Sequence, residues 1–386
     1  MRTKYSLLLL ASLGGAGCVG ASRAEDYATP SALDSDWFRA FRSTFNDTVA
    51  HRFASTGARH CSDAPARVLT ASLRGTGAYA VGMRSATSIN PAWQLHGSPA
   101  RAFDAAVFYP CSDGSGCGAV AERRWPVVVF GIGWASWALR YERTMRHLAS
   151  HGFVVIAPST ADHRAVPLSW EYAQTLLGAL QFAAFEAARP GSLLEGRVDA
   201  SQSGAMGHSM GAGNALVAAS LSGDKQWAAS LGADWPYGPA SLLDFDAQPW
   251  PTVRAFVGLG VAPIVAPVAC LAGLRAHTLM FTPEFDRFVA PDAQRSLFAA
   301  LPPAAPRQLA VMRAASHCWL DEPRDGTGWG FPTSQCEQAE RDPHFTTPQA
   351  QVSWKSRRCV PRDLHQRTLH VASRAATTII ALPVDS

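Results

Sequence analysis

The pentapeptide GHSMG at residues 207–211 fits the pattern G-x-S-x-G, which is typical of a serine nucleophile. It follows apolar, strand-like residues and precedes the helical pattern Asn214–Leu221, so Ser209 falls where a strand meets a helix. Glycines suit this place because a sharp strand–turn–helix forces neighbouring backbones together. The helix that follows presents free N–H groups to a developing negative charge. We therefore predict that Ser209 is an exposed nucleophile rather than part of a small-residue turn.

A serine hydroxyl is a poor nucleophile, so it needs a base, and the base needs an acid that orients it. On a strand–turn–helix serine, the expected chain order is serine, acid, histidine. His317 lies just past a predicted strand that ends at Met312, and we expect it to be the base. His277 opens a strand and would lie at the wrong end of the sheet. His208 adjoins the serine, but adjacent residues on a turn are not expected to converge, so we expect it to point elsewhere.

The candidate acid is Asp286, which follows the predicted strand His277–Phe281 within FTPEFDRFVAP. The ends of parallel strands meet at one edge of a sheet, so this position would bring Asp286 near His317. Glu284 and Asp292 are neighbours that fit solvated loop charges. Asp234, in the earlier segment GADW, is a structural rival for the same role.

The surrounding pattern alternates strands and helices, which indicates βαβ units and a mainly parallel sheet with helices on both faces. Continuous apolar runs such as PVVVF at 126–130 are typical of strands buried on both faces. We predict an α/β domain over residues 76–386, preceded by an N-terminal extension over 25–75. The predicted strands are 105–109, 126–130, 153–157, 277–281 and 308–312, and the predicted helices are 138–150, 169–188, 214–221 and 364–380.

The chain begins with the layout of a secretory signal: Arg2 and Lys4, a short apolar centre, and small residues before a cleavage point after Ala24. Residues 1–24 are therefore predicted to be removed, and the protein to be secreted or periplasmic. Lipid attachment at Cys18 is an alternative, although Gly15 stands where leucine is usual.

Eight cysteines fit an exported chain better than a zinc site, because none of them forms a close C-x₂-C pair. We predict a Cys111–Cys117 disulfide across a Gly-rich turn, and Cys318–Cys336 would close a later loop. The net charge of +4 is scattered, which excludes a nucleic-acid footprint. We expect no metal and no organic cofactor.

Several segments together resemble the secreted esterase branch of the α/β-hydrolases. They are GHSMGAG, VDASQSGAMG, VVVFGIGW, HLASHGFVVIAP, TPEFDRFVAP and AASH. Over residues 75–320 the chain is similar to cutinase-like polyester hydrolases and to the platelet-activating-factor acetylhydrolase and dienelactone hydrolase group. The resemblance implies an α/β-hydrolase fold with Ser209, Asp286 and His317 as a catalytic triad.

The same resemblance implies the binding groups around the serine. The N–H groups of Trp134 and Met210 would form the oxyanion hole, and Trp134 and Trp235 would be aromatic walls for the substrate. Trp235 is assigned because it is expected to follow the next strand. Many relatives carry His-Gly before the oxyanion residue, whereas Ile132 replaces the histidine here.

An apolar insertion is predicted at about 240–275, because residues 255–274 carry no charge between Arg254 and Arg275. Such a length would nominally span a membrane, but two prolines, three glycines and its place between two sheet strands argue against that. Two alternatives remain: a buried extra hairpin or helix pair, or an apolar lid that favours lipid-like or polymeric esters.

The expected reaction is hydrolysis of a carboxylic ester through an acyl-enzyme intermediate. Substrates would be small-molecule or polymeric esters, with contact at a lipid or polymer surface, and we expect a monomer. A peptidase or a thioesterase could use the same triad, because these acyl transfers share their chemistry. A catalytically silent binding module is the alternative outside enzymes.

Overall fold

The computed structural model describes most of the chain between residues 76 and 317. The described residues are 76–96, 103–111, 117–133, 136–159, 169–233, 242–312 without 248, 267, 285, 287 and 304, and residues 315 and 317. The predicted signal segment, the extension at 25–75, the Cys318–Cys336 pair and the helix at 364–380 lie outside them.

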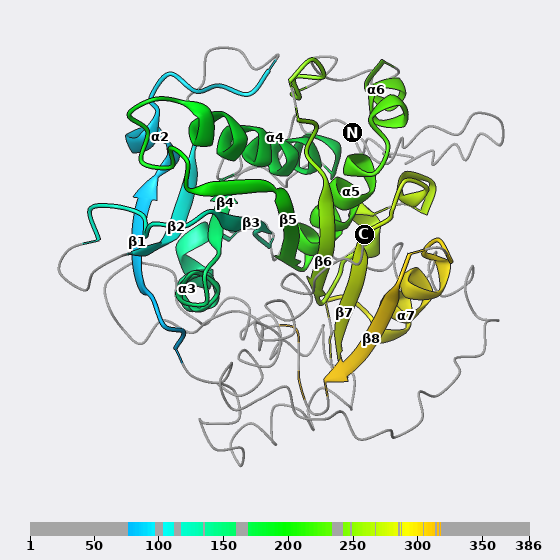
Figure 1. Ribbon diagram of the computed structural model, residues 1–386. Coiled ribbons are helices and arrows are strands. Elements are labelled where there is room, and N and C mark those ends of the chain that lie inside the picture. Colours follow the sequence, from blue (N-terminus) through cyan, green and yellow to red (C-terminus); the bar gives the residue numbers. More distant parts are fainter. Residues whose placement is uncertain are drawn as a thin grey trace, which may run out of the picture.

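A twisted eight-stranded sheet forms the centre of the molecule, in the order β1-β2-β4-β3-β5-β6-β7-β8 (Figure 1). β2 pairs antiparallel with both β1 and β4, and all other neighbours are parallel. The strands are β1 (Ala80–Ser85), β2 (Ala105–Cys111), β3 (Trp125–Gly131), β4 (Val154–Pro158), β5 (Val198–His208), β6 (Val253–Leu259), β7 (His277–Pro283) and β8 (Arg307–Met312). The mainly parallel α/β architecture predicted from the alternating pattern is confirmed.

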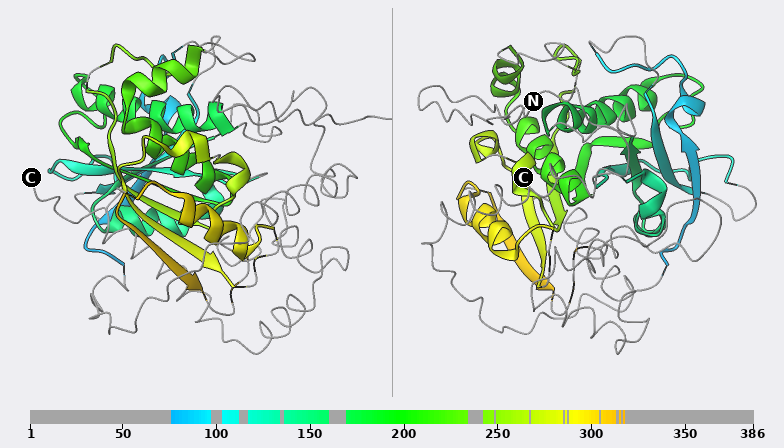
Figure 2. Two further views of the ribbon diagram at one scale, coloured as in Figure 1. Left: turned by 90° about the vertical axis from the view of Figure 1, so that its right-hand side faces the viewer. Right: turned by 180° about the vertical axis from the view of Figure 1, so that it is seen from behind.

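Helices cover both faces of the sheet, with α3 on one side and α4 and α5 on the other (Figure 2). The helices are α2 (Ala86–Ile89), α3 (Glu142–Ser150), α4 (Ser169–Ala188), α5 (Met210–Ser222), α6 (Lys225–Ala233) and α7 (Pro291–Ala300). Short 3₁₀ turns are η3 (Ala138–Tyr141), η4 (Pro263–Val265) and η5 (Val268–Leu271). Among the described residues, none of the helices combines the length and the apolar character needed to cross a membrane.

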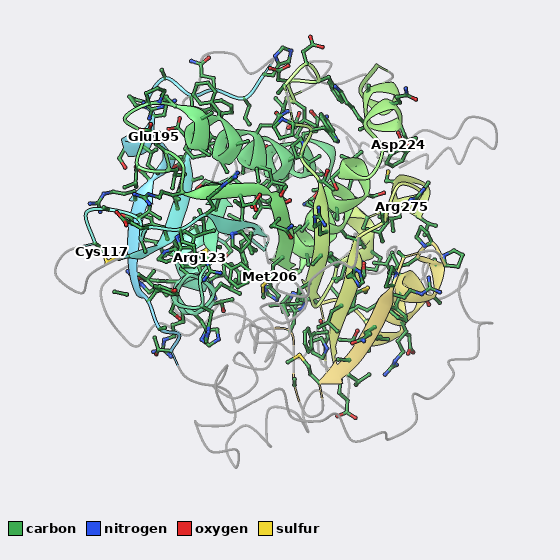
Figure 3. The ribbon with its side chains drawn as sticks, viewed as in Figure 1. Cys117, Arg123, Glu195, Met206, Asp224 and Arg275 are labelled. Carbon is green, nitrogen blue, oxygen red and sulfur yellow. A yellow bond between two sulfur atoms is a disulfide. The ribbon has the colours of Figure 1, made fainter. Side chains whose placement is uncertain are left out.

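The central strands are buried on both faces, which explains their continuous apolar sequences. Val127, Val129 and Phe130 of β3 have no exposed surface. Figure 3 shows Met206 of β5 near the centre of the molecule and Glu195, which precedes this strand, at the periphery. This rigid centre is the frame on which the loops at the carboxyl ends of the strands are held.

The predicted apolar insertion is wrong where the structure describes it. Val253–Leu259 is strand β6, which lies between β5 and β7 and pairs in parallel with both. The following residues form η4 and η5, which pack against α5 and are largely buried. A central parallel strand is apolar on both faces, so no alternation separates it from an apolar insert or lid. The run is therefore core rather than lid.

The predicted disulfide between Cys111 and Cys117 is confirmed, with a Cα–Cα distance of 5.2 Å. It closes the turn that follows β2, and the Tyr109 hydroxyl donates to the Cys117 carbonyl at 2.9 Å. Cys270, in η5, is also disulfide-bonded.

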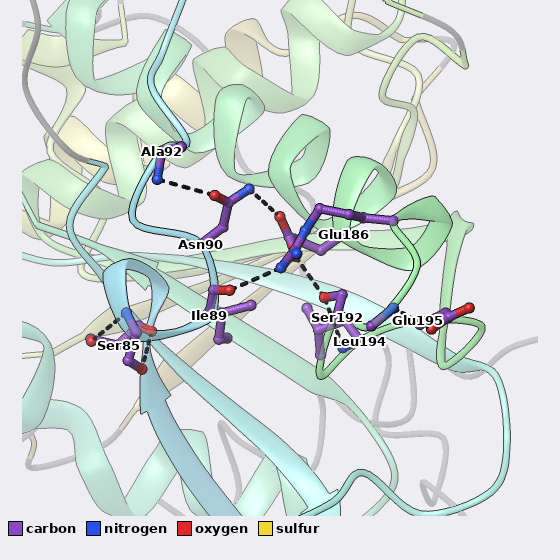
Figure 4. A network of polar contacts seen from close by, with 11 residues as sticks. Ser85, Ile89, Asn90, Ala92, Glu186, Ser192, Leu194 and Glu195 are labelled. Carbon is purple, nitrogen blue, oxygen red and sulfur yellow. Dashed lines mark hydrogen bonds and ion pairs between the residues drawn. The ribbon is translucent and has the colours of Figure 1, made fainter.

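A buried carboxylate joins the end of α4 to the segment after β1 (Figure 4). Glu186 has no exposed surface, and its oxygens accept from Asn90 Nδ2 at 2.7 Å and from Ser192 Oγ at 2.6 Å. Arg189 forms an ion pair with the same carboxylate at 2.7 Å and donates to the Ile89 carbonyl at 2.9 Å. Buried polar groups need hydrogen-bond partners, and these groups find them in one another. The cluster therefore ties α4 to the edge of the sheet.

Candidate active site

Ser209 occupies the turn between β5 and α5 in a strained backbone conformation, with φ 57° and ψ −125°. A non-glycine residue at positive φ is uncommon and persists only where the surrounding structure enforces it. Here the Ser209 N–H donates to the Leu259 carbonyl at 2.9 Å. The Ser209 carbonyl accepts from the N–H groups of Gly213 and Ala262, both at 3.1 Å. The end of β6 therefore holds the turn in place.

The glycines around the serine are required by close backbone approach, as the motif predicts. A Cβ on Gly211 would lie 2.2 Å from the Ile132 carbonyl oxygen, and a Cβ on Gly207 would lie 2.7 Å from the Gly211 carbonyl carbon. A Cβ on Gly131 would lie 2.2 Å from the Gly211 oxygen. The first turn of α5 can therefore touch the end of β3 only because these positions lack side chains.

Asp286 and His317 meet at the carboxyl ends of two neighbouring parallel strands, β7 and β8. Asp286 Oδ2 lies 2.7 Å from His317 Nδ1, and the Asp286 side chain has no exposed surface. Two backbone N–H groups, of Phe288 at 3.0 Å and Val289 at 2.8 Å, donate to the other carboxylate oxygen. The carboxylate is therefore fixed in orientation, and it fixes the imidazole in turn.

Gln294 of α7 is a supporting residue that sequence reasoning missed. Its Nε2 donates to Asp286 Oδ2 at 3.1 Å and to the Val289 carbonyl at 2.9 Å, and the residue is fully buried. The sequence signal that could have suggested Gln294 is its position near the start of α7, the helix that follows Asp286.

Gly260 is a second missed residue, and it adjoins both halves of the site. It follows Leu259, whose carbonyl binds Ser209 N–H, and it has a φ of +58°. A Cβ at Gly260 would lie 3.1 Å from His317 Nδ1 and 3.3 Å from Asp286 Oδ2. The end of β6 thus lies directly against the Asp286–His317 pair and beside the Ser209 turn.

Two rings flank His317. The His208 ring centroid lies 4.6 Å from that of His317 at an interplanar angle of 39°, and the Phe288 ring lies at 5.3 Å. The expectation that His208 points away from the site is therefore wrong. The ring of the residue before Ser209 instead packs against His317.

The segment after β3 is held by two tyrosine hydroxyls. The Ile132 N–H donates to the Tyr172 hydroxyl at 3.0 Å, and the Gly133 N–H donates to the Tyr141 hydroxyl at 3.2 Å. Burial raises the pKa of Tyr172 far above its ordinary value, so this hydroxyl stays protonated. Trp134, predicted to supply an oxyanion donor from this segment, lies outside the described residues. Met210 begins α5, so its N–H has no acceptor within the helix.

The argument that placed Trp235 opposite Trp134 needs correction. Trp235 lies outside the described residues, and the element before it is helix α6 rather than a strand. The next strand after α5 is β6, which is followed by Gly260 and Val261. A short apolar run such as the one in α6 does not distinguish a helix from a strand by periodicity.

Half-buried apolar side chains lie close to the serine. Met210 and Phe288 pack against a small cluster formed by Ala262, Val265 and Val289, separate from the main core. Among the described residues, no cluster of three or more His, Cys, Asp or Glu side chains is arranged to hold a metal ion.

Residues 94–240 match the family described as PETase, PET hydrolase-like. The matched segment contains Ser209 and both predicted oxyanion residues, whereas Asp286 and His317 lie beyond it. No curated protein shows a significant match to the chain.

Proposed function

We propose that the chain is an ester hydrolase of the α/β-hydrolase superfamily, similar over residues 94–240 to PET hydrolase-like proteins, with Ser209, His317 and Asp286 as its catalytic triad. The observation that carries this assignment is the 2.7 Å contact between Asp286 and His317 beside the strained serine turn. The His317 ring packs on the ring of the residue that directly precedes the serine.

In the proposed reaction, Ser209 Oγ attacks the ester carbonyl while His317 takes the hydroxyl proton. Nδ1 of His317 faces Asp286, so Nε2 is the nitrogen that takes the proton and later returns it to the leaving alcohol. The carboxylate of Asp286 stabilises the imidazolium without itself taking the proton. Water then attacks the acyl-enzyme, and the second half repeats the same proton transfers and releases the acid.

The oxyanion of each tetrahedral intermediate would rest on backbone N–H groups of Met210 and Trp134. Met210 is suited to this role because it is the first residue of α5, where the helix dipole favours negative charge. The proposed chemistry uses backbone and side-chain groups of the chain itself.

We propose polymeric or lipid-like esters as substrates, met at a polymer or lipid surface. Support comes from the match to PET hydrolase-like proteins and from the half-buried apolar side chains of Met210 and Phe288 beside the site. Export is proposed with it, since the N-terminal residues resemble a secretory signal and the Cys111–Cys117 disulfide fits an oxidising compartment.

Hydrolysis of p-nitrophenyl esters from acetyl to palmitoyl, together with release of acid from an aromatic polyester film, tests the proposal. We expect turnover in the mature protein and its loss in Ser209→Ala. Ser201→Ala is the matched control, because Ser201 is an exposed serine on β5, the strand that leads into Ser209. Labelling by a fluorophosphonate should likewise require Ser209.

Other outcomes would point to the other classes. Ser209-dependent cleavage of a peptide or thioester, with no ester turnover, would indicate a peptidase or thioesterase. A folded protein that neither labels nor hydrolyses any of these substrates would indicate a binding module and overturn the proposed function.

A further inference from the structure

Three buried groups from three different elements meet beside the catalytic histidine. His208 Nδ1 lies 2.9 Å from the Tyr141 hydroxyl, which in turn accepts the Gly133 N–H at 3.2 Å. A Cβ on Gly133 would lie 2.8 Å from that hydroxyl and 3.3 Å from His208 Nδ1, so the three groups are in direct contact. The His208 ring also contacts the proposed catalytic base, because its centroid lies 4.6 Å from that of His317.

Each member of this chain of contacts is anchored in the sheet or next to it. His208 is the last residue of β5 and directly precedes Ser209. Tyr141 ends η3, and its ring packs on Phe130 of β3 at 4.9 Å. The exposed fractions are 1% for Tyr141 and 2% for His208. Rigid, buried side chains therefore connect the segment that follows β3 to the proposed catalytic base.

The Tyr141 hydroxyl is the shared hydrogen-bonding group of this chain of contacts. It accepts from the Gly133 N–H, and its contact with His208 Nδ1 is a hydrogen bond whose donor depends on the tautomer of His208. A neutral ring suits this buried place, because a second positive charge would oppose the imidazolium that forms on His317 during the reaction.

We propose that Tyr141 and His208 are positioning residues that couple the oxyanion-binding segment to the catalytic histidine. The inference rests on the proposed function. Tyr141 holds the peptide just before Trp134, the predicted oxyanion donor, and His208 links that hydroxyl to the face of His317. Both would act by keeping the donor and the base at fixed positions relative to Ser209, on which transition-state stabilisation depends.

Four variants separate this coupling from simple packing. Tyr141→Phe keeps the ring and removes the hydroxyl. His208→Leu removes the hydrogen-bonding nitrogen, whereas His208→Asn keeps a hydrogen-bonding amide near the position of Nδ1. The double variant Tyr141→Phe/His208→Leu completes the cycle. Tyr109→Phe is the matched control, because Tyr109 is equally buried and its hydroxyl binds the Cys117 carbonyl instead.

The measurements are kcat and KM on p-nitrophenyl butyrate, each corrected for active enzyme by fluorophosphonate titration, and the inhibition constant of an alkyl boronic acid. The boronate forms a tetrahedral adduct with the serine and so reports on transition-state binding. We expect Tyr141→Phe and His208→Leu each to lower kcat about 10- to 100-fold and to change KM by less than about two-fold. Boronate affinity should fall in parallel.

Coupling predicts two further results. The kcat of the double variant should be at most about three-fold below that of the slower single variant, because both changes break the same link. His208→Asn should recover at least about five-fold of the activity that His208→Leu loses, since a hydrogen-bonding partner for Tyr141 is restored. Tyr109→Phe should keep kcat within about two-fold, because its hydroxyl lies outside this chain of contacts.

Opposite results would overturn the inference alone. These are a kcat within about two-fold of wild type in both Tyr141→Phe and His208→Leu, or losses that multiply in the double variant. Wild-type protein without Ser209-dependent turnover would instead overturn the proposed function, and the coupling with it.

Discussion

The carboxylate of Asp286 and the imidazole of His317 lie 2.7 Å apart, although 31 residues separate them in the chain. They meet because β7 and β8 are parallel neighbours, so the loops that leave their carboxyl ends begin side by side. Gln294 of α7 and two backbone N–H groups hold the same carboxylate. The sheet therefore brings the two residues together, and α7, the helix that connects β7 to β8, stabilises the position of the carboxylate.

Replacing Asp286 by asparagine should lower kcat by about 10³- to 10⁴-fold, because the amide no longer stabilises the imidazolium or the correct tautomer. The change in the free energy of unfolding should be small compared with this loss of transition-state stabilisation, since asparagine keeps the shape of the aspartate side chain. Steady-state kinetics and urea unfolding measure the two effects. Asp292→Asn is the matched control, because the Asp292 side chain is 91% exposed and forms an ion pair with Arg295 at the surface. A loss below ten-fold in Asp286→Asn would contradict the assignment of the acid.

Gly260→Ala should damage activity beyond its effect on stability. The new methyl group would lie against His317 Nδ1 and Asp286 Oδ2, and φ is +58°. We expect kcat to fall at least about ten-fold and stability to fall by about 1 kcal/mol or more, because a Cβ is strained at this φ.

Gly191→Ala is a control with the same backbone strain. Its φ is +76°, and a Cβ there would meet no atom within 4 Å. It should lose similar stability and keep wild-type kcat. Equal kcat values for the two variants would show that Gly260 does not define the position of the acid–base pair.

The sequence was sufficient to predict the places of Ser209, Asp286 and His317. Each comes shortly after a predicted strand, and the carboxyl ends of parallel strands share one edge of a sheet. The alternation of strands and helices likewise predicted the α/β architecture. Local patterns of this kind are set by burial, which acts on every residue of an element.

The missed features depend on contacts between distant segments. β6 is apolar on both faces, so its sequence could not be separated from an insertion. Gly260, Gln294 and the contact of His208 with His317 arise from the way strand ends meet, which no periodicity records. The same limit led to the interpretation of α6 as a strand and to the position inferred for Trp235.

Burial of Tyr172 predicts a loss of stability at alkaline pH. Desolvation raises the pKa of this phenol in the folded protein, whereas the unfolded chain ionises near its ordinary value of about 10. Above that pH the unfolded state binds fewer protons than the folded state, so the free energy of unfolding falls as pH rises. The contribution of one such group is at most about 1.4 kcal/mol per pH unit.

Urea unfolding between pH 9 and 11 tests this in wild type and Tyr172→Phe. The variant is expected to be less stable at neutral pH, because the Ile132 N–H and Pro158 carbonyl lose their partner. Its stability should nevertheless decline less steeply with pH. Tyr79→Phe is the control on a half-buried tyrosine. Identical slopes for wild type and Tyr172→Phe would show that Tyr172 does not carry the effect.

Glu186→Leu should destabilise the fold without changing the chemistry of the enzyme. The carboxylate is fully buried and accepts from Asn90, Arg189 and Ser192, so its removal leaves these donors without their acceptor. The loss of this shared acceptor should appear as a lower urea midpoint with an unchanged m-value. Glu195→Leu is the control, because Glu195 is an exposed residue in the adjacent turn.

Activity of Glu186→Leu per fluorophosphonate-titrated site should stay within about two-fold of wild type, since the cluster ties α4 to the sheet edge rather than to the serine turn. A large fall in kcat at unchanged stability would show that this edge of the sheet communicates with the active site.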